Sequence, residues 1–340
     1  MIVIMQPGAK PEEIDSVIRE IERFGFRAFE NPGVERKVLA VLGEVNLDKA
    51  DLVDHFNAMP GVTSCQLISN PWKLASRTYH PEDTIVEVGE ARFGGGFASV
   101  IAGPCSVEDL DQMRASAKAA KAAGARALRG GAFKPRTSPY SFQGLGEEGL
   151  KMLAQVRDEI GLPIVTEVLS EEEVALVDRY ADVLQIGARN VQNYALLKAV
   201  GMLRKPVLLK RGFGTKIKDF VMSAEYLMAG GNLNVILCER GITTFEDSCR
   251  NTTDINAVPV LKKLTHLPVI LDPSHATGKS EYVPSIARAG LAAGCDGLMI
   301  EMHPDPAHAA SDGAQSLNPE AFSALMSQLH RIADAVDVRM

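Results

Sequence analysis

The chain has 340 residues, a formal net charge of −7 at pH 7 and 46% hydrophobic residues. This length suffices for one large and one small domain with a full apolar core. The slightly acidic balance, without a basic tail, argues against nucleic acid as a partner. The apolar runs are too short to span a membrane and no signal peptide pattern opens the chain, so we expect a cytoplasmic protein. The five cysteines lack CxxC spacing and are expected to be reduced thiols.

Residues 1–70 are predicted to form a small domain with the element order βαββαβ. Two helical patterns, at 11–26 and 47–62, are set between four apolar, strand-like segments, at 1–7, 27–30, 37–45 and 63–69. This order is the ferredoxin-like arrangement. Such a domain can sense a small molecule on a biosynthetic enzyme, or it can serve structure and oligomerisation, and the pattern fits both roles equally.

Residues 71–96 are predicted to be a connector between two domains. This stretch carries Pro71, Pro81 and the glycine run 94–96, which are residues typical of loops and domain boundaries. Within it, TIVEVGEARF at 84–93 has the pattern of a β-hairpin.

From residue 97 to residue 340, apolar strand-like segments alternate with amphipathic helical ones. Eight strands with crossover helices in this length predict a catalytic (β/α)₈ TIM barrel. A doubly wound open sheet is the alternative, but no GxGxxG motif opens the first strand-to-helix turn. The strand-like segments are 97–103, 125–130, 162–168, 182–188, 205–211, 234–240, 267–274 and 296–303.

Reactive or charged residues follow these strands at their C-terminal ends. In a barrel those ends form one face, where residues far apart in sequence become neighbours. One charged strand end would be unremarkable, but a complete set predicts a catalytic site. The set consists of Cys105, Arg129, Lys134, Glu167, Arg189, Lys210, Arg211, Arg240, Asp272, His275, Glu301 and His303.

Four residues of this face suggest a metal site. Cys105, His275 and Glu301, with Asp312 on the loop after the last strand, offer a thiolate, an imidazole and two carboxylates. These ligand types suit a borderline divalent transition metal with an open coordination position. Each residue alone would more often be structural.

The cations of this face suggest an anion site. The stretch LRGGAFKPRTSPYSFQG at 128–144 combines glycines with two hydroxyls, Thr137 and Ser138, and basic side chains that include Arg136. Taken alone, it fits a solvated basic loop equally well. Five cations on one face would repel one another unless a bound anion neutralised them, so a substrate with carboxylate and phosphate is expected. The five are Arg129, Lys134, Arg189, Lys210 and Arg240.

Seven ordered motifs are distributed along the chain. They are AGPCSVE (102–108), RGGAFKPRTSPYSFQGLG (129–146), QIGARNVQN (185–193), LLKRGFG (208–214), ILCERGI (236–242), DPSHATG (272–278) and SDG (311–313). Together they resemble 3-deoxy-D-arabino-heptulosonate 7-phosphate (DAHP) synthases, specifically the type I beta form with an N-terminal ferredoxin-like domain. The resemblance spans essentially the whole chain.

The resemblance implies a role for each residue of the predicted site. The metal ligands would be Cys105, His275, Glu301 and Asp312, with Mn²⁺ the first choice and Co²⁺, Fe²⁺ and Zn²⁺ as alternatives. The phosphoenolpyruvate carboxylate would be bound by Arg129, Lys134 and Lys210, and its phosphate by Arg189 and Arg240. Erythrose 4-phosphate would be bound by Arg136 and Thr137, with Ser138 beside them.

The implied activity is that of a transferase of the shikimate pathway. Phosphoenolpyruvate condenses with D-erythrose 4-phosphate and water to give DAHP and phosphate, with the metal acting on the aldehyde oxygen. Lys134 is expected to protonate the developing alkoxide. Water activation stays open between Glu167, a metal-bound water and a phosphate oxygen.

Two alternatives remain at this stage. 3-Deoxy-D-manno-octulosonate 8-phosphate synthases, which use arabinose 5-phosphate, are similar in fold and in the GPC motif, but they carry KANR where this chain has KPRT at 134–137. A non-catalytic metabolite sensor is the other alternative, and it would not need both a metal set and a cation set.

The resemblance also implies regulation through residues 1–70. Family members with this architecture are inhibited by aromatic amino acids at interfaces in a tetramer. We therefore expect Tyr or Phe as an effector at the N-terminal domain, and a homotetramer.

Overall fold

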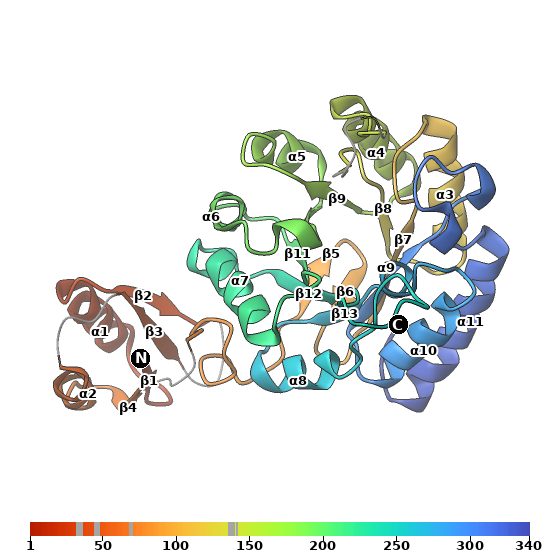
Figure 1. Cartoon of the computed structure of the whole chain (residues 1–340). Helices are drawn as coiled ribbons and strands as arrows, with labels where there is room; N and C mark the ends of the chain where they lie inside the picture. Colours follow the sequence, from red (N-terminus) through yellow and green to blue (C-terminus); the bar gives the residue numbers. More distant parts are fainter. Residues whose placement is uncertain (32–36, 44–47, 68–70, 135–139, 141) are drawn as a thin grey trace. The chain divides into compact units, whose positions relative to one another are not determined.

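The computed structural model describes residues 1–31, 37–43, 48–67, 71–134, 140 and 142–340. They form two compact units: residues 1–83 with 263–266, and residues 84–262 with 267–340 (Figure 1). Each unit is described by itself.

The first unit contains a four-stranded antiparallel sheet with two helices, in the strand order β2-β3-β1-β4. In β1, Val3 is paired with Leu39 on one side and with Cys65 on the other. The predicted ferredoxin-like domain is confirmed. Its elements are β1 (Ile2–Met5), α1 (Pro11–Arg23), β2 (Arg27–Glu30), β3 (Val38–Leu42), α2 (Lys49–Asn57) and β4 (Val62–Gln66).

The core of this unit is apolar, and its helices are capped by acidic side chains. Ile21 and Phe56 face the sheet fully buried, together with Val3 and Leu39. At the start of α1, which has proline as its first residue, the Glu13 carboxylate accepts a hydrogen bond from the backbone N–H of Lys10 at 2.8 Å. The apolar face of α1 and the cap at its start therefore explain why a helix forms where the sequence pattern predicts one.

The second unit is a closed barrel of eight parallel strands surrounded by helices (Figure 1). The strands β7, β12 and β14 are buried at every position, which explains their unbroken apolar runs. The predicted TIM barrel is confirmed. Its strands are β7 (Ser99–Gly103), β8 (Ala127–Arg129), β9 (Ile164–Val168), β10 (Val183–Ile186), β11 (Val207–Lys210), β12 (Val235–Glu239), β13 (Val269–Leu271) and β14 (Gly297–Glu301).

Helices follow the strands as crossover connections. Their N-termini are capped where the sequence supplies a side chain, as at Asp109, whose carboxylate accepts from the Gln112 N–H at 2.7 Å. The helices are α3 (Leu110–Ala122), α4 (Glu147–Ile160), α5 (Val174–Tyr180), α6 (Tyr194–Gly201), α7 (Ile217–Ala229), α8 (Ala257–Leu264), α10 (Val283–Ala292) and α11 (Pro319–Ala335).

A β-hairpin packs against the barrel interior at the N-terminal ends of the strands. Its strands are β5 (Val86–Val88) and β6 (Ala91–Phe93), and their apolar side chains join the same cluster as Ile101 and Met299 inside the barrel. Gly89, in the turn, lies next to Pro163, which immediately precedes β9. The opposite end of the barrel is thus left for function.

One segment departs from the predicted pattern. The sequence pattern extends the seventh strand to residue 274, but β13 ends at Leu271 and a short helix, α9 (Pro273–Thr277), begins. The Asp272 carboxylate caps this helix by accepting from the His275 N–H at 2.9 Å, and Pro273 occupies its first position. His275 consequently lies on a helix, one turn beyond the strand.

None of the helices in the described part of the chain combines the length and the apolar composition needed to cross a membrane.

Candidate active site

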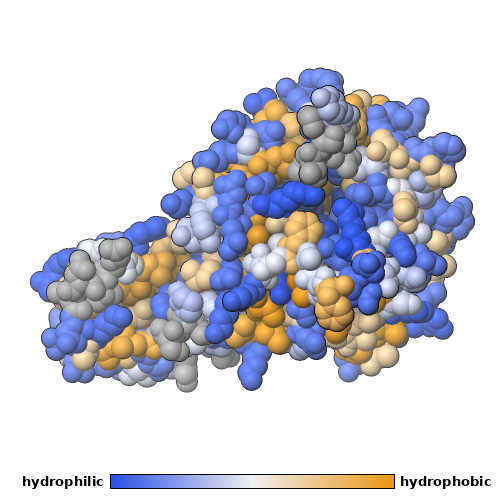
Figure 2. Space-filling view, in the orientation of Figure 1, coloured by the Kyte–Doolittle hydropathy of each residue, from blue (hydrophilic) through white to orange (hydrophobic). Residues whose placement is uncertain are grey.

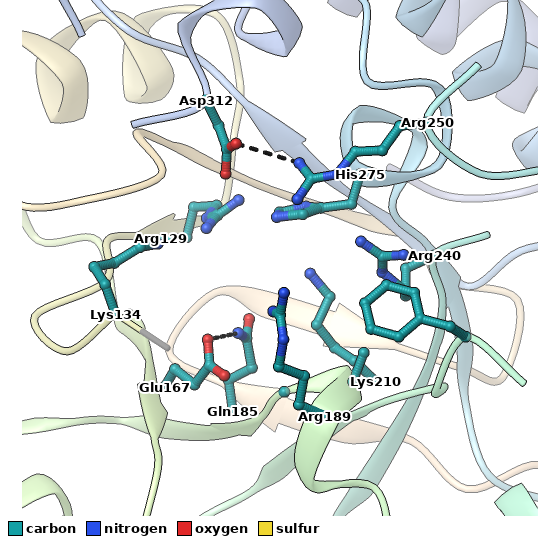
Figure 3. A pocket seen from close by; sticks show the side chains of 13 residues that line it. Arg129, Lys134, Glu167, Gln185, Arg189, Lys210, Arg240, Arg250, His275 and Asp312 are labelled. Atoms are coloured by element: carbon teal, nitrogen blue, oxygen red, sulfur yellow. Dashed lines mark hydrogen bonds and ion pairs between the residues drawn. The ribbon is translucent and has the colours of Figure 1, made fainter. Parts of the chain in front are cut away.

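A cavity of about 220 Å³ is located at the C-terminal ends of the barrel strands. Of the residues singled out by sequence, Arg129, Lys134, Glu167, Arg189, Lys210, Arg240, His275 and Asp312 line it. Figure 3 shows Arg129, His275 and Asp312 close together, with the Lys210 amine next to His275 and with Arg189 and Arg240 farther along the lining. The structure thus brings these eight residues, from widely separated positions, into one site.

Three of the predicted metal ligands form a tight cluster beside this cavity. The Cys105 sulfur and one carboxylate oxygen each of Glu301 and Asp312 all lie within 4.8 Å of one another. The Nε2 atom of His275 is 3.3 Å from Glu301 Oε1. One thiol, one imidazole and two carboxylates at such distances fit a divalent transition metal.

The imidazole of His275 is held in the tautomer that ligation requires. Its Nδ1 is 2.7 Å from Asp272 Oδ2, a fully buried carboxylate, so Nδ1 carries the hydrogen and Nε2 faces Glu301 with a free lone pair. Burial lowers the pKa of His275 to about 4, and the nearby Lys210 acts in the same direction. At neutral pH the ring is therefore uncharged, as a metal ligand would have to be.

Cys105 is buried next to a cation and a carboxylate. The thiol donates to Asp312 Oδ2 at 3.1 Å, and Lys134 Nζ donates to the sulfur and to the Cys105 carbonyl, each at 2.9 Å. Burial raises the pKa of the thiol to about 11, with Glu301 adding to the effect and Lys134 opposing it. A bound cation would displace this proton, because metal ligation deprotonates thiols.

The close approach of Lys134 to Cys105 depends on Gly131. A Cβ atom at this position would lie 2.9 Å from the Cys105 carbonyl oxygen and 3.1 Å from Lys134 Nζ. Any larger residue would push the lysine away from the sulfur. The contact between Lys134 and Cys105 therefore requires glycine at position 131.

Glu301 connects the predicted metal ligands with the cationic side chains of the cavity. Its Oε1 accepts from Arg129 NH1 at 2.6 Å, and both side chains are almost fully buried. Burial alone would raise the pKa of Glu301, but the His275 and Arg129 side chains outweigh it and lower the pKa. The carboxylate is therefore ionised and able to bind a metal.

A second group of cations lines the cavity and is only partly neutralised. Lys210 Nζ donates to Asp272 Oδ2 at 2.5 Å. The NH1 atom of Arg240 is buried without a hydrogen-bond partner among the described residues. The guanidinium groups of Arg189 and Arg240 both lie over the Phe213 ring, 5.6 and 4.6 Å from its centre. An unpartnered buried N–H group next to a cavity indicates a site for an anionic ligand.

Glu167 is placed at the cavity by two neighbours. Its Oε2 accepts from the amide of Gln185 at 3.1 Å. At Gly187 a Cβ atom would lie only 1.9 Å from Glu167 Oε1, so this position needs glycine for the carboxylate to fit. Glu167 is consequently oriented rather than free to rotate.

The charge of the cavity lining selects anions. Six of the lining side chains are cationic and two are carboxylates, with His275 neutral. The cations are Arg129, Lys134, Arg189, Lys210, Arg240 and Arg250. Such an excess favours a ligand that carries more than one negative charge.

Arg211 was expected on the active-site face, but its NH1 is paired with the Glu239 and Asp254 carboxylates at 2.8 and 2.7 Å, and it does not line the cavity. Arg136, Thr137 and Ser138 lie outside the described residues, so their predicted contacts are not placed.

Four residues at or beside the cavity were missed by sequence reasoning: Gln185, Phe213, Arg250 and Gln315. Gln185 lies inside β10 and Phe213 inside a glycine-rich loop, where neither charge nor strand-end position marks them. Arg250 occurs midway along the loop between β12 and α8. Its positive charge on a strand-to-helix loop was the available signal.

The fold and the site together define a class. A (β/α)₈ barrel with a metal-type donor cluster beside a cation-lined cavity has the features of an enzyme acting on small, multiply charged anions.

Comparison with known proteins narrows this class to one family. Residues 82–337 match the DAHP synthetase I family, and residues 1–70 match the DAHP synthase ferredoxin-like domain. A phospho-2-dehydro-3-deoxyheptonate aldolase of Thermotoga maritima is 45% identical over 340 residues, covering 100% of both chains. The chain belongs to the DAHP synthetase I family.

Solved structures agree with this placement, and a second group of relatives carries the name of a different aldolase. A crystal structure of the Thermotoga maritima DAHP synthase superposes with a TM-score of 0.79, covering 99% of this chain and 98% of the other. A truncated form of the synthase from that organism has a TM-score of 0.74 and covers 78% of this chain. A 2-dehydro-3-deoxyphosphooctonate aldolase of Rhodopseudomonas palustris is 34% identical, over 72% of this chain and 92% of its own length.

Proposed function

We propose that this chain is a 3-deoxy-7-phosphoheptulonate synthase, which condenses phosphoenolpyruvate with D-erythrose 4-phosphate and water to give DAHP and phosphate. The observation that carries the proposal is the cavity lined by six cationic side chains, beside the donor cluster formed by Cys105, His275, Glu301 and Asp312. Family membership and the full-length match to the Thermotoga maritima relative support it. The octulosonate alternative has weaker support because that match leaves more than a quarter of the chain uncovered.

Phosphoenolpyruvate carries a carboxylate and a phosphate, and the cavity offers cations for both. We assign the carboxylate to Arg129, Lys134 and Lys210, and the phosphate to Arg189 and Arg240. The unpartnered N–H group of Arg240 supports its assignment, because a phosphate oxygen would supply the missing acceptor. The Phe213 ring, lying against both Arg189 and Arg240, would keep the two guanidinium groups in place.

The second substrate is assigned to the KPRT segment. Arg136, Thr137 and Ser138 would bind the phosphate of erythrose 4-phosphate, through a guanidinium group and two hydroxyls. The proline and arginine of this segment, in place of the KANR string of the octulosonate enzymes, favour the four-carbon sugar.

The donor cluster would hold a divalent transition metal through Cys105, His275, Glu301 and Asp312, and we propose Mn²⁺ as the ion. When bound, such a metal supplies Lewis-acid polarisation of the substrate's aldehyde oxygen. A neutral His275 and an ionised Glu301 are in the protonation states that metal binding requires.

The remaining steps belong to side chains of the cavity. Carbon 3 of phosphoenolpyruvate attacks the aldehyde carbon, and a proton from Lys134 Nζ neutralises the alkoxide that forms. Water adds to carbon 2, and phosphate leaves with cleavage of its C–O bond. Glu167, held by Gln185, is our first choice for accepting a proton from that water.

A product assay with two sugars tests this function. Phosphate release from phosphoenolpyruvate is measured with erythrose 4-phosphate and with arabinose 5-phosphate, before and after chelation. We expect turnover with the four-carbon sugar that EDTA removes and Mn²⁺ restores. Turnover with only the five-carbon sugar would assign the chain to the octulosonate enzymes, and none with either would favour a metabolite sensor.

We further propose a regulatory role for residues 1–70, joined by a connector at 71–96 to the catalytic residues 97–340. Tyr or Phe would be the inhibitor, and the chain would act as a homotetramer in the cytoplasm. The match of residues 1–70 to a domain found on DAHP synthases supports the first of these assignments.

A further inference from the structure

A pair of side chains connects the two carboxylates of the donor cluster. Arg250 NH1 donates to Asp312 Oδ1 at 3.2 Å and to Gln315 Oε1 at 2.8 Å. The amide nitrogen of Gln315 in turn donates to Glu301 Oε2 at 2.7 Å. We call Arg250 and Gln315 the carboxylate bridge, because they form a continuous path from Asp312 to Glu301.

Gln315 is fixed by the turn that follows Asp312. This turn, η3 (Gly313–Gln315), begins directly after Asp312, whose backbone has the left-handed φ of +53° that is uncommon for a non-glycine residue. The Gln315 N–H donates to the Asp312 carbonyl at 3.2 Å, and its side chain is only 2% exposed. The unusual backbone therefore directs a buried amide toward Glu301.

Arg250 is anchored to the helix that carries His275. Its backbone N–H donates to the Thr277 carbonyl at 2.9 Å. The next residue, Asn251, donates from its backbone to Ala276 O and from its side chain to His275 O, each at 2.9 Å. The bridge therefore starts from the segment that also positions the imidazole.

The bridge occupies one oxygen of each carboxylate and leaves the other directed into the donor cluster. In Asp312, Oδ1 is bound by Arg250 while Oδ2 accepts from the Cys105 thiol. In Glu301, Oε2 is bound by Gln315 while Oε1 lies 3.3 Å from His275 Nε2. Arg250 thus orients Asp312, and Gln315 orients Glu301 together with Arg129, which donates to Glu301 Oε1 at 2.6 Å.

We propose that Arg250 and Gln315 are positioning residues that preorganise Asp312 and Glu301 for the divalent metal. This inference rests on the proposed function, which places a metal in the donor cluster. The bridge fixes two side chains that a metal would otherwise have to order. Hydrogen-bond partners of metal ligands typically contribute about 10- to 100-fold to metal affinity.

A different role for Arg250 would be contact with a substrate phosphate, since it also lines the cavity. The two roles separate in a metal titration without substrate. Only the bridge predicts that loss of Arg250 weakens binding of the metal alone, and only the bridge predicts the same effect for Gln315, which is buried behind the cavity lining.

The test is a titration of metal-free protein with Mn²⁺ alone, in which free Mn²⁺ is measured by its electron paramagnetic resonance signal. The variants are Arg250→Met, Gln315→Met, the double variant and Arg250→Lys. Arg288→Met is the matched control, because Arg288 also donates to a glutamine, Gln328, at 2.7 Å, on the outer helices α10 and α11. Thermal unfolding of each metal-free variant shows whether it remains folded.

We expect Arg250→Met and Gln315→Met each to weaken Mn²⁺ binding about tenfold or more, with the double variant losing less than the product of the two. Arg250→Lys should recover part of the loss, and Arg288→Met should bind as the wild type does. Wild-type affinity in both single variants would overturn the bridge. Should Gln315→Met fail to fold, the half-exposed Arg250 variants still decide the question.

The titration also separates this inference from the proposed function. A wild-type chain that binds Mn²⁺ but does not convert erythrose 4-phosphate would overturn the function and leave the bridge supported by its own variants. A wild-type chain that binds no divalent metal would overturn both.

Discussion

The barrel mouth buries charged side chains, whereas the N-terminal unit buries mainly apolar ones. At the mouth, Arg129, Lys210, Asp272 and Glu301 are each at most 5% exposed. In residues 1–83 and 263–266, no Asp, Glu, Lys or Arg of the described positions is buried; the interior is made of side chains such as Phe56 and Ile21. Figure 2 shows hydrophilic residues gathered around the mouth of the barrel.

The difference separates residues kept for chemistry from residues kept for stability. Burying ions costs free energy that pairing only partly returns, whereas burying apolar side chains is the main favourable contribution to folding. Substitutions at the mouth that leave these buried ion pairs intact, such as one at Cys105, should therefore remove activity with little loss of stability. Substitutions in the N-terminal core should do the reverse.

The largest effect is expected for Cys105→Ala, which removes a predicted metal ligand. Metal-dependent turnover should fall to background, because the donor cluster loses its thiolate. The melting temperature of the metal-free protein should stay near that of the wild type. Cys295→Ala, at another buried cysteine outside the cavity, is the control. Full activity of Cys105→Ala would remove this residue from the metal site.

Phe56→Ala tests the other side of the comparison. Phe56 is fully buried in the core of the first unit, so its truncation should lower the free energy of unfolding of that unit by about 3–5 kcal/mol. Uninhibited turnover by the barrel should persist. Denaturant unfolding measures the change, and Leu67→Ala, at an exposed position of the same unit, is the control. A loss of turnover with unchanged stability would contradict the expectation that the N-terminal core serves stability and not catalysis.

A buried histidine gives the first unit a pH dependence. Burial lowers the pKa of His266 to about 4, and His80 and Arg77 act in the same direction, against the hydrogen bond to the Leu74 carbonyl. The unfolded chain, with a histidine pKa near 6.5, then binds the proton more tightly. Stability should therefore fall as pH drops from about 6.5 to 4, by an amount on the order of 3 kcal/mol.

This pH dependence can be assigned by substitution. His266→Gln keeps a donor for the Leu74 carbonyl, now 2.7 Å from His266 Nε2, and removes the titrating ring. Its stability, measured by denaturant unfolding at pH 7 and pH 4.5, should fall less on acidification than that of the wild type. His330→Gln, on the exposed side of α11, should behave like the wild type. If the free energy of unfolding falls equally between pH 7 and pH 4.5 in all three proteins, His266 is not the cause of the pH dependence.

The smallest effect on turnover is expected for deletion of residues 1–70. The barrel has its own core, so kcat should stay within a factor of about three. Inhibition by Tyr or Phe, measured in parallel, should disappear. Unchanged inhibition would place the effector site outside this segment.

The strands could be predicted from sequence because fully buried parallel strands are continuous apolar runs, as in β7 and β14. The ends of these strands could be predicted because a charged residue ends the apolar run, as Arg129 does in β8 and Glu301 in β14. The predicted position of His275 was only approximate. The apolar pattern suggests a longer strand, but the Asp272 cap begins a helix there.

The carboxylate bridge could not be predicted in the same way. Arg250 and Gln315 lie in segments without helical or strand periodicity, and their partners are 62 and 14 residues away, at Asp312 and Glu301. Only the backbone turn at Asp312 and the pairing of residue 250 with α9 bring them together. Contacts of this kind depend on tertiary structure and leave no local signal.

The most direct test of the account is a stepwise metal titration of the metal-free chain, with bound metal and DAHP formation measured on the same samples. We predict that turnover rises in proportion to bound metal and stops rising at one ion per chain, with the Cys105→Ala variant showing neither. Full turnover by protein that holds far less than one ion per chain would contradict the claim that the barrel mouth is a metal-dependent active site.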